Sequence, residues 1–169
     1  MPLIATITSS IATSVGVLGA LIALATLVKA LLEYMQQGRQ KRAEHFFELR
    51  RKLKENVEFS RVAGLLDEAS LNDDEAASAR EELRRLSFQI KRDYLGLFEE
   101  VAIAMNSGLI KPQVAHYMFG YYALLCWTSD DFWINVNKLS DYWSLFDDFC
   151  KQMKAEQNSF EFRRRDFKF

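Results

Sequence analysis

The stretch "TSSIATSVGVLGALIALATLV", residues 8–28, has no charged side chain and forms most of an uncharged segment from Leu3 to Val28. As a helix this segment is about 39 Å long, at roughly 1.5 Å per residue. The hydrocarbon core of a bilayer is about 30 Å thick. A helix of this length in a soluble protein normally carries a polar stripe, and this one has none. The sequence therefore predicts a transmembrane anchor helix within residues 1–38.

A cleaved signal peptide is the main alternative, and "ALAT" at residues 23–26 resembles a cleavage site. However, the start of the chain lacks Lys and Arg, and the apolar run exceeds the usual length of about 7 to 15 residues. The helical pattern also continues without a break into residues 29–54. These features favour a span that is retained in the protein.

Positive charge gathers after the uncharged segment, at Lys29, Arg39, Lys41 and Arg42. By the positive-inside rule, we predict a single-pass protein of the inner (plasma) membrane, with its N-terminus outside and its C-terminal domain in the cytoplasm. Arg39, Lys41 and Arg42 are candidate contacts for anionic lipid, worth about 1 kcal/mol each. The alternative is that they set the topology and otherwise face solvent.

One face of the predicted span carries small side chains, which let two helix backbones approach closely in lipid. Because this sequence contains no second span, the ladder predicts self-association and a homo-oligomer. The alternative is chance, since Ala, Gly and Ser are common in spans. The candidate contact residues are Ala5, Ser9, Ala12, Thr13, Gly16, Ala20 and Ala23.

We predict that the rest of the chain, residues 39–169, forms an all-α cytoplasmic helical bundle. Pro and Gly number two and seven, and runs with a strand period are hard to find. A juxtamembrane helix is expected to continue to about residue 54, with Gly38 as its weakest point. A short helix is expected over 57–68, followed by a capping box formed by Asn72 and Glu75.

The clearest amphipathic helix lies in residues 87–109. Its apolar positions include Tyr94 and Phe98, whereas Lys91, Arg92, Glu99 and Glu100 are expected mostly to face away from the core. Gly108 is expected just after its C-terminus. Pro112 is expected in the first turn of a central buried helix over 111–127.

Ser129 and Ser140 are expected to cap the last helices. Cys126 and Cys150 are too few for a disulfide framework and are expected to be buried apolar side chains. Aromatic rings of this region are expected to supply much of the core: Trp127, Phe132, Trp133, Tyr142, Trp143, Phe146 and Phe149.

The tail "SFEFRRRDFKF", residues 159–169, alternates aromatic and basic residues. Arg163, Arg164, Arg165 and Phe167 form a candidate binding patch for lipid headgroups or a partner. A nucleic-acid backbone is a less favoured partner, and a net charge of −1 gives the chain no field that attracts one. The alternative is a terminal segment that packs on the bundle or frays.

Sequence motifs of known enzymes are not found: the chain has no H-E-x-x-H, Walker A, G-x-S-x-G or C-x-x-C. His116 is expected to be a core or lining histidine. Adjacent carboxylates such as Glu99 and Glu100 do not face the same way on a helix. We therefore predict a non-enzymatic protein without catalytic residues, cofactor or metal.

The stretches "KRAEHFFELRRKLKEN" (residues 41–56) and "LGLFEEVAIAMNSGLIKPQVAHYMFGYYALLCW" (residues 95–127) resemble a bacterial family of uncharacterised proteins. The resemblance covers about residues 28–150, and it implies one N-terminal span followed by a cytoplasmic helical domain of unknown function. Such sequences often have Pro after "KEN", where this chain has Val57. The resemblance implies architecture and no functional residues.

These features predict a membrane-anchored helical protein that self-associates through its span and acts as a membrane effector or sensor, for example in anti-phage defence. Its partners would be the lipid bilayer, further copies of itself, and a protein or small ligand on the cytoplasmic bundle. Two alternatives remain open at this point. One is a passively tethered protein-binding module, and the other is a helical bundle that binds a nucleotide or nucleic acid.

Overall fold

The computed structural model describes the backbone of residues 2–71 and 74–159, and the side chains of residues 22–38, 40–71 and 76–158. Within these ranges the chain is helical and contains no strand, which confirms the predicted all-α class. The chain divides into two compact units, Met1–Lys41 and Arg42–Phe169. Each unit is described by itself.

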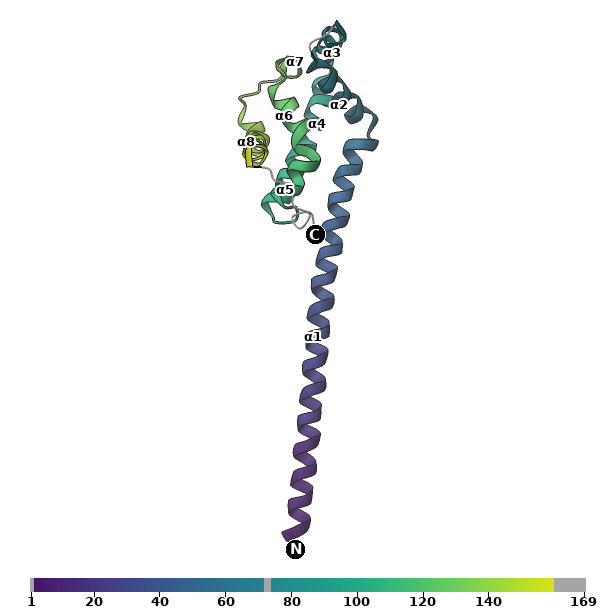
Figure 1. The fold of residues 1–169 in the computed structure, drawn as a ribbon, viewed down its shortest axis with the longest axis vertical. Helices are drawn as coiled ribbons and strands as arrows, with labels where there is room; N and C mark the ends of the chain where they lie inside the picture. The colour runs from purple at the N-terminus through teal and green to yellow at the C-terminus, as the bar shows by residue number, and fades with distance from the viewer. Residues whose placement is uncertain (1, 72–73, 160–169) are drawn as a thin grey trace. The chain divides into compact units, whose positions relative to one another are not determined.

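The first unit consists of most of helix α1, which runs from Pro2 to Glu55 and passes through Gly38 without a break (Figure 1). Its described apolar side chains are exposed, among them Leu24, Leu27 and Leu31. Among the described residues, no helix combines the length and the apolar character that crossing a bilayer requires. The side chains of residues 2–21, which form most of the predicted span, lie outside the described part.

The second unit begins with the last turns of α1, whose buried Phe46, Leu49 and Leu53 join the core. Asn56 then separates α1 from α2 (Val57–Ala69). Its backbone is extended, and its side-chain oxygen accepts hydrogen bonds from the backbone N–H of Glu58 and Phe59, at 3.0 and 3.2 Å. This cap satisfies two N–H groups of the first turn of α2.

Helix α3 (Asp74–Arg85) packs against α2, and the Arg80 guanidinium joins the two by donating to the carbonyl oxygen of Ala69. The predicted capping box cannot be compared, because Asn72 and the side chain of Glu75 lie outside the described residues.

Helix α4 (Phe88–Asn106) is the amphipathic helix predicted from the sequence. Ser87 caps its start by accepting from the backbone N–H of Ile90. Gly108 follows its end with a φ of 69°, as predicted for a residue that must adopt the left-handed conformation.

The next segment differs from the single buried helix predicted over 111–127. Pro112 does begin it, but α5 (Pro112–Ala115) passes into a π turn, η1 (His116–Gly120), before α6 (Tyr121–Thr128). One side of this segment, including Phe119 and Cys126, is buried, whereas Tyr117 and Tyr121 are exposed.

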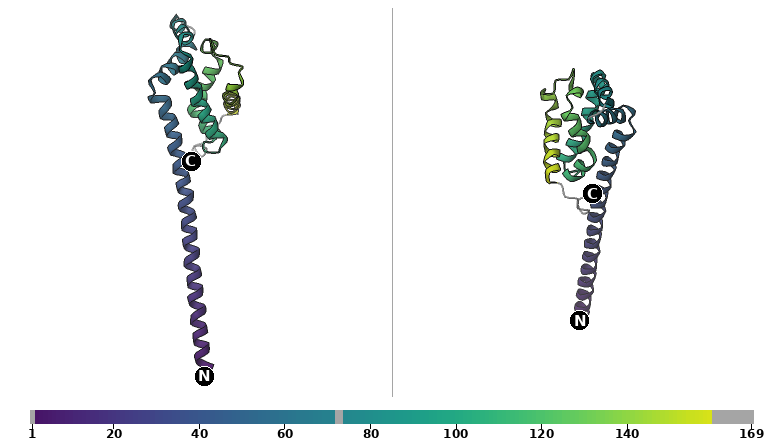
Figure 2. Two further views of the ribbon diagram at one scale, coloured as in Figure 1. Left: turned by 180° about the vertical axis from the view of Figure 1, so that it is seen from behind. Right: turned by 45° about the horizontal axis from the view of Figure 1, so that its top comes forward.

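The described part of the second unit ends with α7 (Asp130–Trp133), the 3₁₀ turn η2 (Asp141–Trp143) and α8 (Ser144–Ser159). Ser129 and Ser140 cap α7 and η2 as predicted, by accepting from the backbone N–H groups two or three residues on. Helix α8 packs against both α4 and α6, and Figure 2 shows these helices from two further sides.

The core of the second unit is aromatic, and it includes both free cysteines as predicted. Phe132, Trp133, Trp143, Phe146 and Phe149 are buried as predicted, but Tyr142 is 87% exposed. Tyr142 lies in the exposed 3₁₀ turn, so its ring faces solvent while that of the neighbouring Trp143 turns inward.

Lys91 also differs from the prediction. It was expected to face away from the core, but its exposed fraction is only 1%. Its ammonium group donates to the carbonyl oxygen of Ile134 at 2.8 Å and lies 5.8 Å from the ring centre of Phe132. Burial lowers the pKa of Lys91. A hydrogen bond and a ring face thus replace part of the hydration that the ammonium group loses.

Candidate functional site: an aromatic hollow beside the π turn

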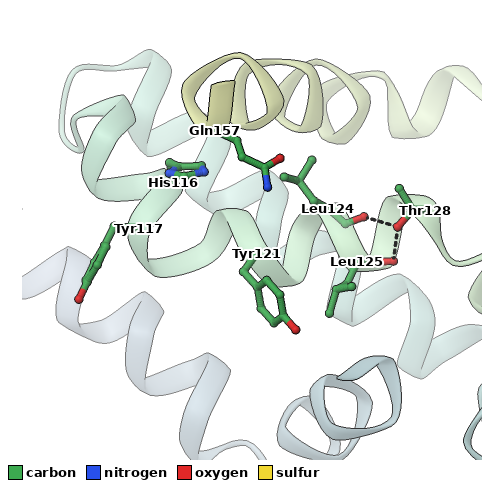
Figure 3. A pocket seen from close by; sticks show the side chains of 7 residues that line it. All are labelled: His116, Tyr117, Tyr121, Leu124, Leu125, Thr128 and Gln157. Atoms are coloured by element: carbon green, nitrogen blue, oxygen red, sulfur yellow. Dashed lines mark hydrogen bonds between the residues drawn. The ribbon is translucent and has the colours of Figure 1, made fainter. Parts of the chain in front are cut away.

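A hollow of about 370 Å³ opens beside the π turn, and we call it the aromatic hollow (Figure 3). This volume lies within the range of small-ligand pockets, about 300 to 1,000 Å³. Six of its seven lining residues come from one continuous stretch, η1 and α6, and the seventh comes from α8. They are His116, Tyr117, Tyr121, Leu124, Leu125, Thr128 and Gln157.

The π turn contributes His116 and Tyr117 to the lining of the hollow. A π turn is a rare local widening of a helix, and such turns are frequent at functional sites. Here it lies within an otherwise α-helical path from Pro112 to Thr128. Tyr117 and Tyr121, four residues apart, are 58% and 56% exposed and present their rings at the hollow.

His116 is held close to the backbone at the end of the π turn. A Cβ placed on Gly120 would lie only 2.9 Å from Cδ2 of the His116 ring and 3.4 Å from the sulfur of Met153. Any larger residue at position 120 would therefore displace the imidazole. Burial lowers the pKa of His116, and the carboxylate of Glu156 acts in the opposite direction.

Two carboxylates outside the lining, those of Asp67 and Glu156, act on residues of the hollow. The hydroxyl of Tyr121 donates to Oδ1 of Asp67 at 2.7 Å, and this bond, together with burial and the charge of Asp67, raises the pKa of Tyr121 to about 12. Burial raises the pKa of Tyr122, and Asp67 adds to the effect. None of the described lining residues is Lys, Arg, Asp or Glu, so these two carboxylates are the charges shown to act on it. The hollow therefore suits an apolar or aromatic group that is neutral or positively charged, and it disfavours an anion.

A second hollowed region lies over α4 and has a different character. Two adjoining depressions of about 480 and 490 Å³ share Arg92, Glu99 and Trp143. Their walls carry charges of both signs, and two of these form an ion pair of 2.8 Å between Lys52 and Glu100. Burial raises the pKa of Glu99. The mixed charges of these walls indicate no single class of ligand, whereas the lining of the aromatic hollow is aromatic and apolar.

The described residues support neither a reactive cysteine nor a metal site. Burial raises the pKa of both Cys126 and Cys150, so neither thiol is activated as a nucleophile. Among the side chains that the structure describes, no group of three or more His, Cys, Asp or Glu residues is placed to hold a metal ion.

Most of the site residues predicted from the sequence cannot be placed. Of those that can, Ala23 and Lys41 are exposed and Arg42 is half-buried. The side chains that lie outside the described part are Ala5, Ser9, Ala12, Thr13, Gly16, Ala20, Arg39, Arg163, Arg164, Arg165 and Phe167.

The sequence pointed to one residue of the aromatic hollow. His116 was expected to be a core or lining histidine, and it lines the hollow. Tyr117, Tyr121 and Asp67 were missed. No local rule predicts them, because the Tyr121–Asp67 bond joins residues 54 positions apart.

No protein-family model, curated protein or solved structure matches this chain. The family resemblance described from the sequence therefore stays a prediction.

Proposed function

We propose that this protein is a non-enzymatic, membrane-anchored helical protein that self-associates through its N-terminal segment and senses a ligand or partner through its helical unit. The uncharged segment of residues 3–28, which falls within the single helix α1, carries this proposal. Exposed apolar side chains continue beyond it at Leu31 and Leu32. Such a row is poorly suited to water and well suited to lipid or to another copy of the helix.

The aromatic hollow supports the sensing part of the proposal. It combines exposed aromatic rings with a restricted set of polar groups, which is the usual composition of a ligand site. A self-associating membrane protein with such a site suits an effector whose assembly perturbs the envelope. Anti-phage defence is one setting in which cells use such a response.

Membrane fractionation tests the anchor. The intact chain is expected to sediment with membranes at high speed, to resist alkaline carbonate and to dissolve in detergent. A chain without residues 1–28 is expected to stay in the supernatant. If the intact chain stayed in the supernatant without detergent, the anchor would be refuted.

Native mass spectrometry in mild detergent tests the self-association. The predicted contact face contains Gly16, and Gly16→Leu is expected to separate the oligomer because it blocks close approach of the backbones. The helical period places Leu18 on the opposite face, so Leu18→Phe is the matched control and is expected to leave the oligomer intact. A monomer with or without Gly16→Leu would contradict the proposal.

A passively tethered binding module is the second candidate, and the aromatic hollow favours it as well. Replacing residues 3–28 with an unrelated span separates the two functions. The effector is expected to lose its ability to release dye from liposomes or to permeabilise cells after the exchange. A module that uses the span only as an anchor would keep its activity.

A further inference from the structure

The lining of the aromatic hollow indicates the chemistry of its ligand. Two exposed tyrosines, Tyr117 and Tyr121, line it together with His116, and Leu124 and Leu125 supply an apolar surface. Guanidinium groups bind well over tyrosine faces. The carboxylate of Asp67 lies 2.7 Å from the hydroxyl of Tyr121, and that of Glu156 acts on His116, so the site favours an aromatic segment that carries arginine.

This chain contains such a segment directly after α8. Residues 160–169 read "FEFRRRDFKF", with four aromatic, four basic and two acidic side chains. They lie outside the described residues, but the chain leads to them from the hollow itself, because Gln157 of α8 is one of its lining residues. Phe160 follows three positions later, a reach of at most about 10 Å in an extended chain.

We propose that residues 160–169 of this chain are the intrinsic ligand of the aromatic hollow, with phenylalanine and arginine side chains against Tyr117 and Tyr121. The tail then competes with any external ligand of the site. This inference rests on the hollow being the binding site of the proposed function, and it does not depend on the membrane span.

Tethering makes the competition strong. A segment joined to its site by a few residues has an effective concentration in the millimolar range. If the free segment binds with a dissociation constant near 100 μM, the tethered tail reduces the apparent affinity for an added copy about tenfold. The tail thus sets the threshold that an external ligand must exceed.

Peptide binding tests the proposal. The full chain and a chain that ends at Ser159 are compared in the same uncharged detergent, which offers the tail no anionic lipid. A labelled peptide of residues 159–169 is titrated into each. One-to-one binding is expected to the shortened chain, and at least tenfold weaker binding to the full chain. A peptide with Arg163→Gln, Arg164→Gln and Arg165→Gln is expected to bind at least tenfold more weakly to the shortened chain.

Two variants of the shortened chain locate the site. Tyr117→Ala removes an exposed ring from the aromatic hollow and is expected to weaken peptide binding at least tenfold. Phe88→Ala is the matched control, because Phe88 is 54% exposed and lines the region over α4 instead. It is expected to leave binding unchanged. Thermal unfolding followed by tryptophan fluorescence checks that both variants fold.

Four results would overturn the proposal: no binding to the shortened chain, equal binding to the two chains, binding unaffected by Tyr117→Ala, or binding lost in Phe88→Ala. Competition that weakens when the full chain is diluted would show that the tail comes from a second copy, and it would also refute the proposal. If the peptide fails to bind while the intact chain still sediments with membranes, the tail inference fails and the membrane anchor stands.

Discussion

Gly120 lies at the end of the π turn, and its replacement by alanine tests whether the His116 ring is held against the backbone there. The chain offers two matched controls, since Gly64 and Gly96 are also inside helices. A Cβ added at either control position meets nothing within 4 Å. At Gly120 the same Cβ would lie 2.9 Å from Cδ2 of His116.

These surroundings predict that replacing glycine by alanine stabilises the protein at Gly64 and Gly96 but destabilises it at Gly120. In an open helix interior, Gly→Ala stabilises by about 0.5–1 kcal/mol, because alanine loses less conformational freedom on folding. Carbon atoms in contact normally lie about 3.5–4.0 Å apart, so the 2.9 Å approach at Gly120 is too close. Overpacking of this kind costs about 1–3 kcal/mol. Gly120→Ala is therefore expected to be less stable than Gly96→Ala by about 1–3 kcal/mol.

Thermal unfolding of the full chain, followed by the fluorescence of the three tryptophans of the second unit, measures the difference. For a unit of this size, 1 kcal/mol corresponds to about 3–6 °C in melting temperature. A double-mutant cycle then assigns the cause. In a His116→Ala background the clash is absent, so Gly120→Ala is expected to become neutral or stabilising, with a coupling of about 1–3 kcal/mol.

Stabilisation of the protein by Gly120→Ala to the same extent as by Gly96→Ala would refute the reasoning. Destabilisation that persists unchanged in the His116→Ala background would also refute it, because the clash would then lie elsewhere. In either case the imidazole would not be positioned by the glycine.

Three further predictions follow from the caps and the titratable groups of the second unit. Asn56→Ala is expected to lower the free energy of unfolding by about 1 kcal/mol, because it removes the acceptor for two backbone N–H groups. Asn56→Asp keeps that acceptor, so an equal loss of stability in both variants would contradict the cap. Burial lowers the pKa of His116, so the neutral ring is favoured in the folded state. Its contribution to stability is complete above the unfolded pKa of about 6.5 and is lost as the pH falls below it. The melting temperature of His116→Gln should therefore fall less than that of the parent chain between pH 7 and pH 5, and parallel curves would argue against this origin. Burial raises the pKa of Glu99, so Glu99→Gln is expected to stabilise the protein at pH 7. Below about pH 4 no stabilisation is expected, because the glutamic acid and the glutamine are then both neutral. A stability difference between the two proteins that does not depend on pH would contradict this.

Local features of the fold were predictable because they depend on residues a few positions apart. Gly108 follows α4 with a positive φ, Pro112 begins α5, and Ser129 and Ser140 cap the turns after them. In each case the residue either adopts the backbone conformation that its position requires or accepts a hydrogen bond from a backbone N–H group within about three residues along the chain. Sequence alone is then sufficient.

Burial was predicted less well, and Lys91 shows why. Its position three residues before Tyr94 places it on the apolar stripe of α4, but a charged side chain was expected to avoid the core. It is buried because the carbonyl oxygen of Ile134, 43 residues away, accepts its hydrogen bond. Tyr142 is the reverse case, an aromatic side chain left in solvent by the turn that carries it.

The sequence by itself determined the helical class, the starts of several helices and the uncharged segment of residues 3–28, since each follows from composition or from neighbours along the chain. The tertiary structure alone decided which side of the segment from Pro112 to Thr128 is buried, and it thereby created the aromatic hollow. The physical reason is that residues distant in the chain complete the surroundings of the hollow. Here Gln157 of α8 lines the hollow together with residues of η1 and α6, and Asp67 of α2 accepts a hydrogen bond from Tyr121. No periodicity within one helix encodes this arrangement.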